Sequence, residues 1–333
     1  MVTRKGTVLL MAKPFFPWMG NKEKLVPYIH QLIPPHVKQF TEVFGGSGAV
    51  ILGLQPKKGR LDIYNDLNDD LFNVFCCVKE KSFSLAKELK FLPVHGRTPF
   101  AFYRDMAAHE PDFYRHIEEE KRVVAESTCF TEEEIRELLT ILDGNAKFFD
   151  VRRAAAFLFT TYGSFSGTGN SVGIKTVDPQ AIVDKLPQVS RRLDSVFLEH
   201  QDALVLIPKE DRPDGIIYAD PPYMLTEKVY DVRFLPEHHI VLHDRASSCK
   251  GYVIISYGYD DRIILYKDDF FIISLKRTNP LSQTEGSTFR ELIITNYDPS
   301  PYLNKQLDIF GQATEAMWEP VILHRPRRIL KAD

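Results

Sequence analysis

Cysteine is scarce in this chain, and its spacing excludes several common kinds of site. The 333 residues contain four cysteines, and no two of them form a C-x-x-C pair. Cys76 and Cys77 are adjacent, a spacing that suits neither an ordinary disulfide nor a zinc site. We therefore expect buried, reduced thiols, no metal centre and a cytoplasmic protein, because reducing compartments keep cysteines free.

Long apolar runs and an excess of positive charge are also missing. The apolar stretch 7–12 is too short for a signal peptide or a membrane span, and no later run approaches about 20 apolar residues. We expect no membrane partner. The formal net charge is −3, so the chain lacks the overall basic character of many nucleic-acid-binding proteins, although a local basic stripe is enough for such binding.

What the sequence contains is a βα rhythm at both ends, typical of a doubly wound α/β fold. Strands are expected at 39–44, 60–65, 196–200, 215–219, 252–257, 270–275 and 290–297. A helix is expected to begin after the turn at 45–48, and another at 69–79, where Asn68 can cap the first turn.

The middle of the chain is mainly helical and richly charged. Thr131 and Glu134 form a capping-box pattern, Asp143-Gly144 is expected to end that helix, and 148–162 predicts an apolar helix. We expect a core domain formed by 1–79 and 186–300, an inserted domain at 80–185, and a tail at 301–333 to which the sequence assigns no role.

The tetrapeptide Asp220-Pro221-Pro222-Tyr223 follows the expected strand 215–219. It therefore lies at the carboxyl end of a buried strand, where open α/β sheets bind ligands. Prolines stiffen the loop and lack an N–H, the aspartate and a carbonyl can accept both hydrogens of an amino group, and the tyrosine can stack on a flat ring. The pattern suits a planar amine such as a nucleobase, although Asp and Pro are also ordinary turn residues.

Two further patterns suggest a nucleoside ligand. The glycine-rich turn 45–48 allows close approach of backbone N–H groups, and Asp66, at the end of the next expected strand, suits a carboxylate that accepts ribose hydroxyls. A nicotinamide dehydrogenase could show the same pair. Ahead of the first strand, Trp18 and Lys22 flank Gly20, and they either contact a ligand or simply begin a helix.

Together these motifs resemble the D12 class of N6-adenine DNA methyltransferases, the DNA adenine methylase family. That family shows W-x-G-G-K, E-P-F-x-G-x-G-x-V, D-I-N-x-D-L and D-P-P-Y. This chain has W-M-G-N-K at 18–22, E-V-F-G-G-S-G-A-V at 42–50, N-D-L-N-D-D-L at 65–71 and D-P-P-Y at 220–223, in that order. The resemblance spans 14–297. Val43 replaces the family's proline and Asn21 its second glycine, and neither change removes a ligand-contacting group.

The resemblance implies a Rossmann-like methyltransferase sheet, S-adenosylmethionine as methyl donor, and double-stranded DNA as partner. A cognate restriction endonuclease is plausible, and we expect a monomer. The cofactor-binding residues would be Trp18, Gly20, Lys22, Glu42, Phe44, Gly46, Ser47, Gly48, Asp66, Leu67, Asp202 and Asp220. Among these, Asp66 would hold the ribose, Asp202 the adenine, and Trp18 with Lys22 the methionine end.

The same resemblance implies that Asp220, Pro221, Pro222 and Tyr223 act on an adenine flipped out of the duplex. Asp220 and the Pro221 carbonyl would accept hydrogen bonds from N6 while Tyr223 stacks on the base. A carboxylate with a pKa of about 4 is too weak to deprotonate a neutral arylamine, so Asp220 would act by positioning and charge stabilisation.

The inserted domain would read the DNA target, with Ser166 and Asn170 in the small, polar segment 164–173 as the groove-entering candidates. Basic residues would contact phosphates; the candidates are Arg152, Arg153, Lys175, Arg191, Arg192, Lys276 and Arg277. The family's usual basic, asparagine-rich hairpin is absent, so the recognition sequence does not carry over.

Other classes stay open at this point. Related amino-methyltransferases act on cytosine N4, RNA or a protein amide, but serine or asparagine more often replaces Asp220 in them. A catalytically inactive DNA-binding relative would have lost Asp66 or the D-P-P-Y motif, and both are present. A dehydrogenase would not explain D-P-P-Y or 18–22.

Overall fold

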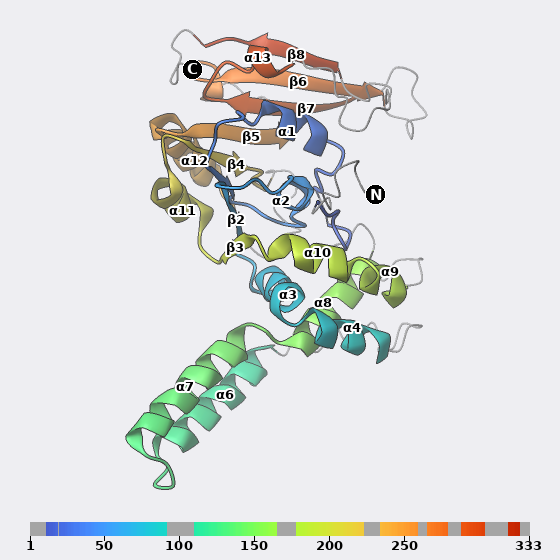
Figure 1. The fold of residues 1–333 in the computed structure, drawn as a ribbon. Coiled ribbons are helices and arrows are strands. Elements are labelled where there is room, and N and C mark those ends of the chain that lie inside the picture. Colours follow the sequence, from blue (N-terminus) through green and yellow to red (C-terminus); the bar gives the residue numbers. More distant parts are fainter. Residues whose placement is uncertain are drawn as a thin grey trace. The chain divides into compact units, whose positions relative to one another are not determined.

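The computed structural model describes residues 11–18, 20–91, 110–164, 178–222, 234–258, 265–278, 288–303 and 319–326. The chain divides into two compact units, one formed by 1–21 with 68–200 and the other by 22–67 with 201–333. Both are drawn in Figure 1. Among the described residues, no helix has the length and apolar character needed to cross a membrane.

The second unit is an α/β sheet domain. Its elements are α1 (Val26–Leu32), β1 (Gln39–Glu42), α2 (Ala49–Gly53), β2 (Leu61–Asn65), α11 (Ala203–Glu210), β4 (Gly215–Ala219), α12 (Pro236–Ser248), β5 (Tyr252–Gly258), β6 (Phe271–Thr278), β7 (Thr288–Thr295), α13 (Ser300–Leu303) and β8 (Glu319–His324). These strands lie in the order β2-β1-β4-β5-β7-β6-β8. Pairing is parallel from β2 to β5 and antiparallel from β5 to β8.

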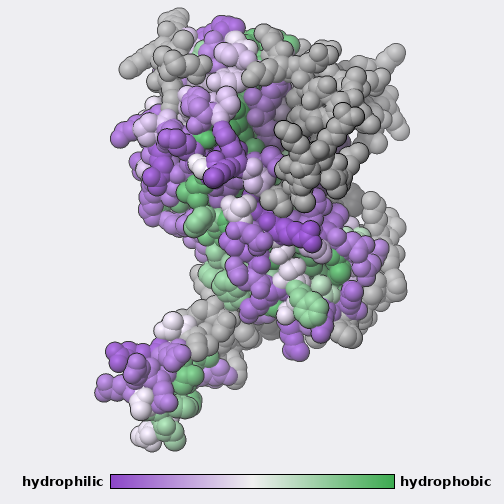
Figure 2. Space-filling model, viewed as in Figure 1, coloured by the Kyte–Doolittle hydropathy of each residue, from purple (hydrophilic) through white to green (hydrophobic). Residues whose placement is uncertain are grey.

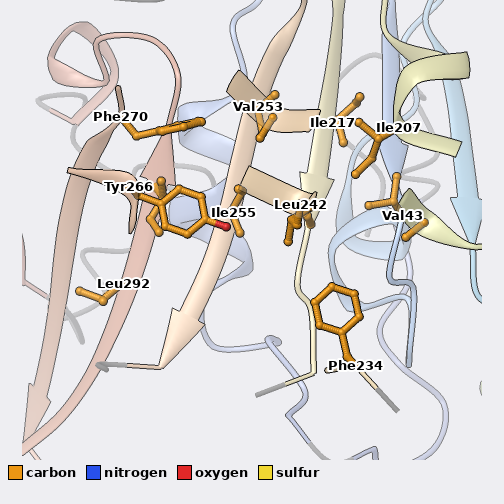
Figure 3. Packing of buried hydrophobic residues seen from close by; sticks show 14 of the residues in the cluster. Val43, Ile207, Ile217, Phe234, Leu242, Val253, Ile255, Tyr266, Phe270 and Leu292 are labelled. Atoms are coloured by element: carbon orange, nitrogen blue, oxygen red, sulfur yellow. The ribbon is translucent and has the colours of Figure 1, made fainter. Parts of the chain in front are cut away.

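Helices α11 and α12 pack on one face of this sheet. Leu206 and Ile207 of α11 and Leu242 of α12 share one buried cluster with Ile217 of β4 and Val253 of β5. Figure 3 shows Ile207 and Leu242 pointing toward these strand residues. Alternate residues along β4 and β5 enter the cluster, as the two-residue period of a strand requires. Burying this apolar face is what holds the sheet against the two helices.

The first unit is mainly helical. It contains α3 (Asp69–Glu80), α4 (Ser82–Phe91), α6 (Glu110–Ala125), α7 (Glu132–Lys147), α8 (Val151–Gly163), α9 (Pro179–Val183), α10 (Leu186–Leu193) and β3 (Val196–Glu199). Helix α3 packs on α8 and α10, and α4 packs on α8. The unit therefore includes α3, α10 and β3, which lie outside the inserted domain expected at 80–185.

The expected helix ends are confirmed in part. Asn68 caps α3 by accepting from the Leu71 N–H, and Thr131 with Glu134 forms a capping box on α7. The expected stop at Asp143-Gly144 is wrong, because α7 continues to Lys147. An interior glycine costs a helix only about 1 kcal/mol. The chain turns instead at Phe149, whose φ is +66°, and Asp150 then caps α8.

The expectation of buried thiols holds for half of the cysteines. Cys76 and Cys77 are buried in α3, and burial raises the pKa of each thiol to about 12. Cys129 is exposed and Cys249 is partly exposed. All four are free thiols. The adjacent pair is inward-facing because α3 packs against several neighbours at once.

The C-terminal tail, which the sequence left unassigned, contributes a strand. β8 pairs antiparallel with β6 and has a register shift between Ile272 and Ile273. Val321 and Leu323 on β8 are both 46% exposed. The segment has β-branched residues but lies beyond the motifs, so only its pairing with β6 reveals its place in the sheet.

Candidate active site

The glycine turn, Asp66 and Asp220 lie at one edge of the second unit's sheet. Strand β1 pairs in parallel with β2 on one side and with β4 on the other, and Glu42 lies in register with both Tyr64 and Tyr218. The carboxyl ends of the three strands therefore coincide. The glycine turn follows β1, Asp66 follows β2, and Asp220 follows β4. This is the edge at which parallel α/β sheets bind ligands.

The turn after β1 owes part of its glycine content to internal packing. A Cβ at Gly45 would collide with the ring of Tyr64, whose hydroxyl donates to the Gly46 carbonyl at 2.8 Å. Gly46 and Gly48 have φ of +50° and +65°, which L-residues with a Cβ rarely adopt. The sequence suggested only ligand approach as the reason for these glycines, whereas Gly45 is required by Tyr64.

Asp66 is tied to the same turn. Its Oδ2 accepts a hydrogen bond from the Gly46 N–H at 2.7 Å. This contact joins the ends of β1 and β2 and holds the carboxylate, which is partly exposed, beside the glycine backbone. Leu67, the next residue, is 40% exposed.

Glu42 is a buried acid beneath this edge. It is 2% exposed, and its Oε2 accepts from the Ile51 N–H at 2.9 Å. Burial raises the pKa of Glu42 well above its ordinary value. The bond from Ile51 opposes this shift, while the charges of Asp220 and Asp66 add to it. The Glu42 carboxyl group therefore stabilises the start of α2 through its hydrogen bond. It does so at a site where a negative charge on this group is unfavourable.

Asp220 is held by two side chains. The Lys22 Nζ lies 3.0 Å from the Asp220 Oδ1, and the Ser256 hydroxyl donates to the same oxygen at 2.8 Å. Lys22 is 7% exposed and Asp220 is 18% exposed. The resemblance predicted Lys22 as a ligand of the cofactor; here its partner is Asp220.

The remaining predicted residues of this unit lie around the same edge or next to it. Ser47 and Pro221 are buried, and Pro222 is partly buried. Phe44 packs edge-on against Phe234 with ring centroids 5.4 Å apart. Asp202 caps α11 by accepting from the Leu204 N–H at 2.7 Å, so its carboxylate has a structural partner at the position expected to contact an adenine.

Trp18 and Gly20 belong to the first unit. Trp18 is partly exposed and packs near Phe16 and Phe157, with ring centroids 6.1 Å and 6.0 Å away. Gly20 has a φ of +73°. Tyr223, Ser166, Asn170 and Lys175 lie outside the described residues, as do the side chains of Lys276 and Arg277.

The basic candidates of the first unit differ in accessibility. Arg152 is 81% exposed, and its Nε lies 3.8 Å from Glu88. Arg153 is 10% exposed and lies 3.5 Å from Asp70. Arg191 is exposed. Arg192 is fully buried and donates to the Ser195 hydroxyl at 3.0 Å, so the expectation that it contacts DNA phosphates is wrong for this structure.

Sequence reasoning missed two residues at this edge, Tyr218 and Ser256. The sequence predicts Tyr218 only as part of an apolar strand, and Ser256 only as part of a later one. The two-residue period of a strand could have identified Tyr218. Residues two positions apart share a face, so Tyr218 lies on the same face as Asp220.

Known proteins resemble this chain along most of its length. The model of the family described as D12 class N6 adenine-specific DNA methyltransferase matches residues 18–279. The Type II methyltransferase M1.LlaDCHI of Lactococcus lactis subsp. cremoris is 24% identical over 309 residues, covering 86% of this chain and 95% of that protein. The Type II methyltransferase M.MjaIII of Methanocaldococcus jannaschii is 24% identical over 275 residues, covering 77% and 78%.

The mixed α/β sheet, the glycine turn with Asp66 and Asp220 at its edge, and the family match agree with one another. The sheet is consistent with a Rossmann-like methyltransferase fold. The chain belongs to the D12 class N6 adenine-specific DNA methyltransferase family.

Proposed function

We propose that this protein transfers a methyl group from S-adenosylmethionine to N6 of an adenine flipped out of double-stranded DNA. The observation that carries the proposal is the Asp220 carboxylate, which is held at the carboxyl end of β4 beside the glycine turn and Asp66. An acceptor fixed there can receive the amino hydrogens of a base that reaches the sheet edge.

The residues of this edge fit S-adenosylmethionine, which supplies a sulfonium methyl group when bound. The positive φ angles of Gly46 and Gly48 favour glycine at both positions, and glycine leaves this part of the turn without side chains. The Asp66 carboxylate would accept hydrogen bonds from the ribose hydroxyls. Phe44, Ser47, Glu42, Leu67 and Asp202 would complete this side of the site. Trp18, Gly20 and Lys22 would hold the methionine end.

On the base, Asp220 and the Pro221 carbonyl would accept hydrogen bonds from N6, while Pro222 stiffens the loop and Tyr223 stacks on the ring. These bonds would draw the amino nitrogen out of conjugation with the ring, so that its lone pair can attack the sulfonium methyl carbon while the carbon–sulfur bond breaks and a neutral thioether leaves. Asp220 positions the nitrogen and stabilises the positive charge that develops on it. After transfer the nitrogen is acidic, and Asp220 or water can take the proton.

The helical first unit is our candidate for DNA contact. Arg152 is an exposed candidate for a phosphate contact in this unit. Arg153, Lys175 and, on β6 of the second unit, Lys276 remain predictions, as do Ser166 and Asn170 as base-reading candidates. A cognate restriction endonuclease, a monomeric state and a cytoplasmic location also remain predictions from the sequence.

The decisive experiment incubates the protein with labelled S-adenosylmethionine and unmethylated genomic DNA and maps the modified bases. We expect N6-methyladenine at a defined sequence. N4-methylcytosine, or no label in DNA, would overturn the proposal and favour an amino-methyltransferase on another substrate or an inactive relative.

The Asp220→Ala variant should lose at least about 100-fold of the methyl-transfer rate, since an acceptor aimed at the reacting group is removed. Binding of S-adenosylmethionine, measured by calorimetry, should change by less than about threefold. Asp220→Asn, which keeps the shape beside Lys22, should be similarly slow. Asp214→Ala serves as the control, because the Asp214 side chain is 45% exposed and pairs with Lys38. Full activity in both Asp220 variants would contradict the assigned role.

A further inference from the structure

Tyr218 and Ser256 form a hydrogen-bonded pair of buried side chains that contacts Asp220. Strand β5 lies parallel to β4 with Tyr218 opposite Ile254 and Ala219 opposite Ile255. Ser256 follows one position further, level with Asp220. Because side chains alternate along a strand, Tyr218 and Asp220 share one face of β4, and the diagonal neighbour on β5 is within reach of both.

The two contacts have a defined direction. The Ser256 hydroxyl donates to the Asp220 Oδ1 at 2.8 Å, and the Tyr218 hydroxyl lies 2.9 Å from the Ser256 Oγ. A serine hydroxyl carries a single hydrogen. Since that hydrogen goes to Asp220, Tyr218 must be the donor in the second bond. The order of donation is therefore Tyr218 to Ser256 to Asp220.

Burial keeps this pair in place. Ser256 is 0% exposed and Tyr218 is 1% exposed. Burial raises the pKa of Tyr218 well above its ordinary value, with the Asp220 charge adding to the shift and the bond to Ser256 opposing it. The phenol thus keeps its proton at neutral pH and remains a donor. Hydrogen bonds that end on a charged group in a buried site are among the stronger ones.

The pair meets Lys22 at a single atom. Lys22 Nζ lies 3.0 Å from the same Oδ1 that accepts from Ser256. The Asp220 Oδ1 thus accepts from Lys22 and Ser256, which lie on two different segments. The carboxylate cannot rotate about its Cβ–Cγ bond without breaking one of these contacts. The direction of its second oxygen is therefore fixed as well.

We propose that Ser256, supported by Tyr218, is a positioning residue that orients the Asp220 carboxylate toward the amino group of the target base. This inference rests on the proposed function, since it concerns how the same acceptor is aimed. Neither Ser256 nor Tyr218 needs to touch the base or the cofactor. Their role is to fix the orientation of the Asp220 carboxylate before the reaction begins. No rotational freedom of that carboxylate is then lost when the transition state forms.

The test measures single-turnover methyl transfer to adenine in a DNA substrate, using the full-length protein. Ser256→Ala should slow the transfer step about 10- to 100-fold, the loss expected for one hydrogen bond to a charged group. The KM for S-adenosylmethionine and its affinity should stay within about threefold. Ser256→Cys, a weaker donor of similar size, should be intermediate in rate.

Tyr218→Phe supplies the readout that separates positioning from general stability. Acting alone, this change should slow transfer about 3- to 10-fold. In the Ser256→Ala background it should have little further effect, because Tyr218 reaches Asp220 only through Ser256. If the rate losses of the two single variants add in the double variant, Tyr218 acts independently of Ser256, and its supporting role is overturned.

Ser274→Ala is the matched control. Ser274 is also a fully buried strand serine in this unit, and among the described residues its hydroxyl has no hydrogen-bond partner. Its rate should be that of the wild type. If the wild type methylates adenine and Ser256→Ala is equally fast, the positioning role is overturned alone. If the wild type methylates no adenine in DNA, both the proposed function and this inference are overturned.

Discussion

At the scale of single residues, the acids of this edge serve different purposes although they lie close together. Asp66 accepts from the glycine turn, Asp220 is paired with Lys22 and Ser256, and Glu42 is buried beneath them. Three carboxyl groups near one another cannot all carry charge without cost. Glu42 is buried, and burial together with the charges of Asp220 and Asp66 raises its pKa.

Glu42 therefore makes stability depend on pH. Its folded-state pKa is raised above the ordinary value of 4.5, so its contribution to stability is fully present below about that pH and is lost as pH rises through the folded-state pKa. Glu42→Gln removes this loss. The free energy of unfolding of the variant, relative to wild type, should increase from pH 4.5 upward, by about 1.4 kcal/mol for each unit of difference between the two pKa values.

Urea unfolding of both proteins from pH 4.5 to 8 measures this difference. Glu237→Gln, a change at an exposed glutamate of α12, accounts for loss of a surface charge. A difference between wild type and Glu42→Gln that stays constant with pH would contradict a raised pKa for Glu42.

At the scale of elements, the helices of the first unit are joined by polar contacts as well as apolar packing. Asn73 of α3 is 0% exposed; its Nδ2 donates to the Asp150 carbonyl at 2.9 Å, and its Oδ1 accepts from the Asp150 N–H at 2.8 Å. Asp150 in turn caps α8 through the Arg153 N–H. One side chain thus fixes where α8 begins relative to α3.

Asn73→Ala should lower the free energy of unfolding of this unit by about 2 to 4 kcal/mol, because it leaves the partly buried Asp150 N–H without its partner and opens a small void where the buried Asn73 side chain was. Circular dichroism during urea unfolding gives the value. The comparison variant is Asn68→Ala, which removes the N-cap of the same helix and should cost about 1 kcal/mol. Equal losses in the two variants would argue against the bridging role.

A second feature of the first unit is the acidic hairpin of α6 and α7, which pack on each other. Glu118, Glu119 and Glu120 on α6 and Glu132 to Glu134 on α7 are exposed. Val123 is also 70% exposed, and Figure 2 shows hydrophilic and hydrophobic residues side by side on this hairpin. Such a surface repels phosphates, so the hairpin is a poor candidate for DNA contact.

At the scale of the whole molecule, the net charge of −3 means that affinity for DNA must come from local groups. We expect the logarithm of the binding constant to fall linearly with the logarithm of the salt concentration. Arg152→Ala should reduce the magnitude of that slope by about 1, because one phosphate contact is lost. Fluorescence anisotropy over a range of salt concentrations measures it.

Arg136→Ala is the control for this prediction. Arg136 is exposed on α7, and its Nε donates to the Glu132 carbonyl. It lies among acidic neighbours, so its loss should leave the slope unchanged. An unchanged slope in Arg152→Ala as well would remove Arg152 from the phosphate contacts.

Local patterns in the sequence determined most of the elements and the order of the motifs. Strand 215–219, the caps at Asn68 and Thr131, and the placement of Asp66 and Asp220 at strand ends depend on nearest neighbours along the chain, and all of them are confirmed. Helix and strand periods, caps and turns are local physical preferences, so they can be recognised without knowing the fold.

Tertiary structure alone decided what each side chain at the edge contacts. It joined Lys22 and Ser256 to Asp220, pressed Tyr64 against Gly45, and paired β8 with β6. These partners are far apart in the chain, and no local preference specifies them. They follow from sheet register and from the close packing of the interior, which only the folded chain establishes.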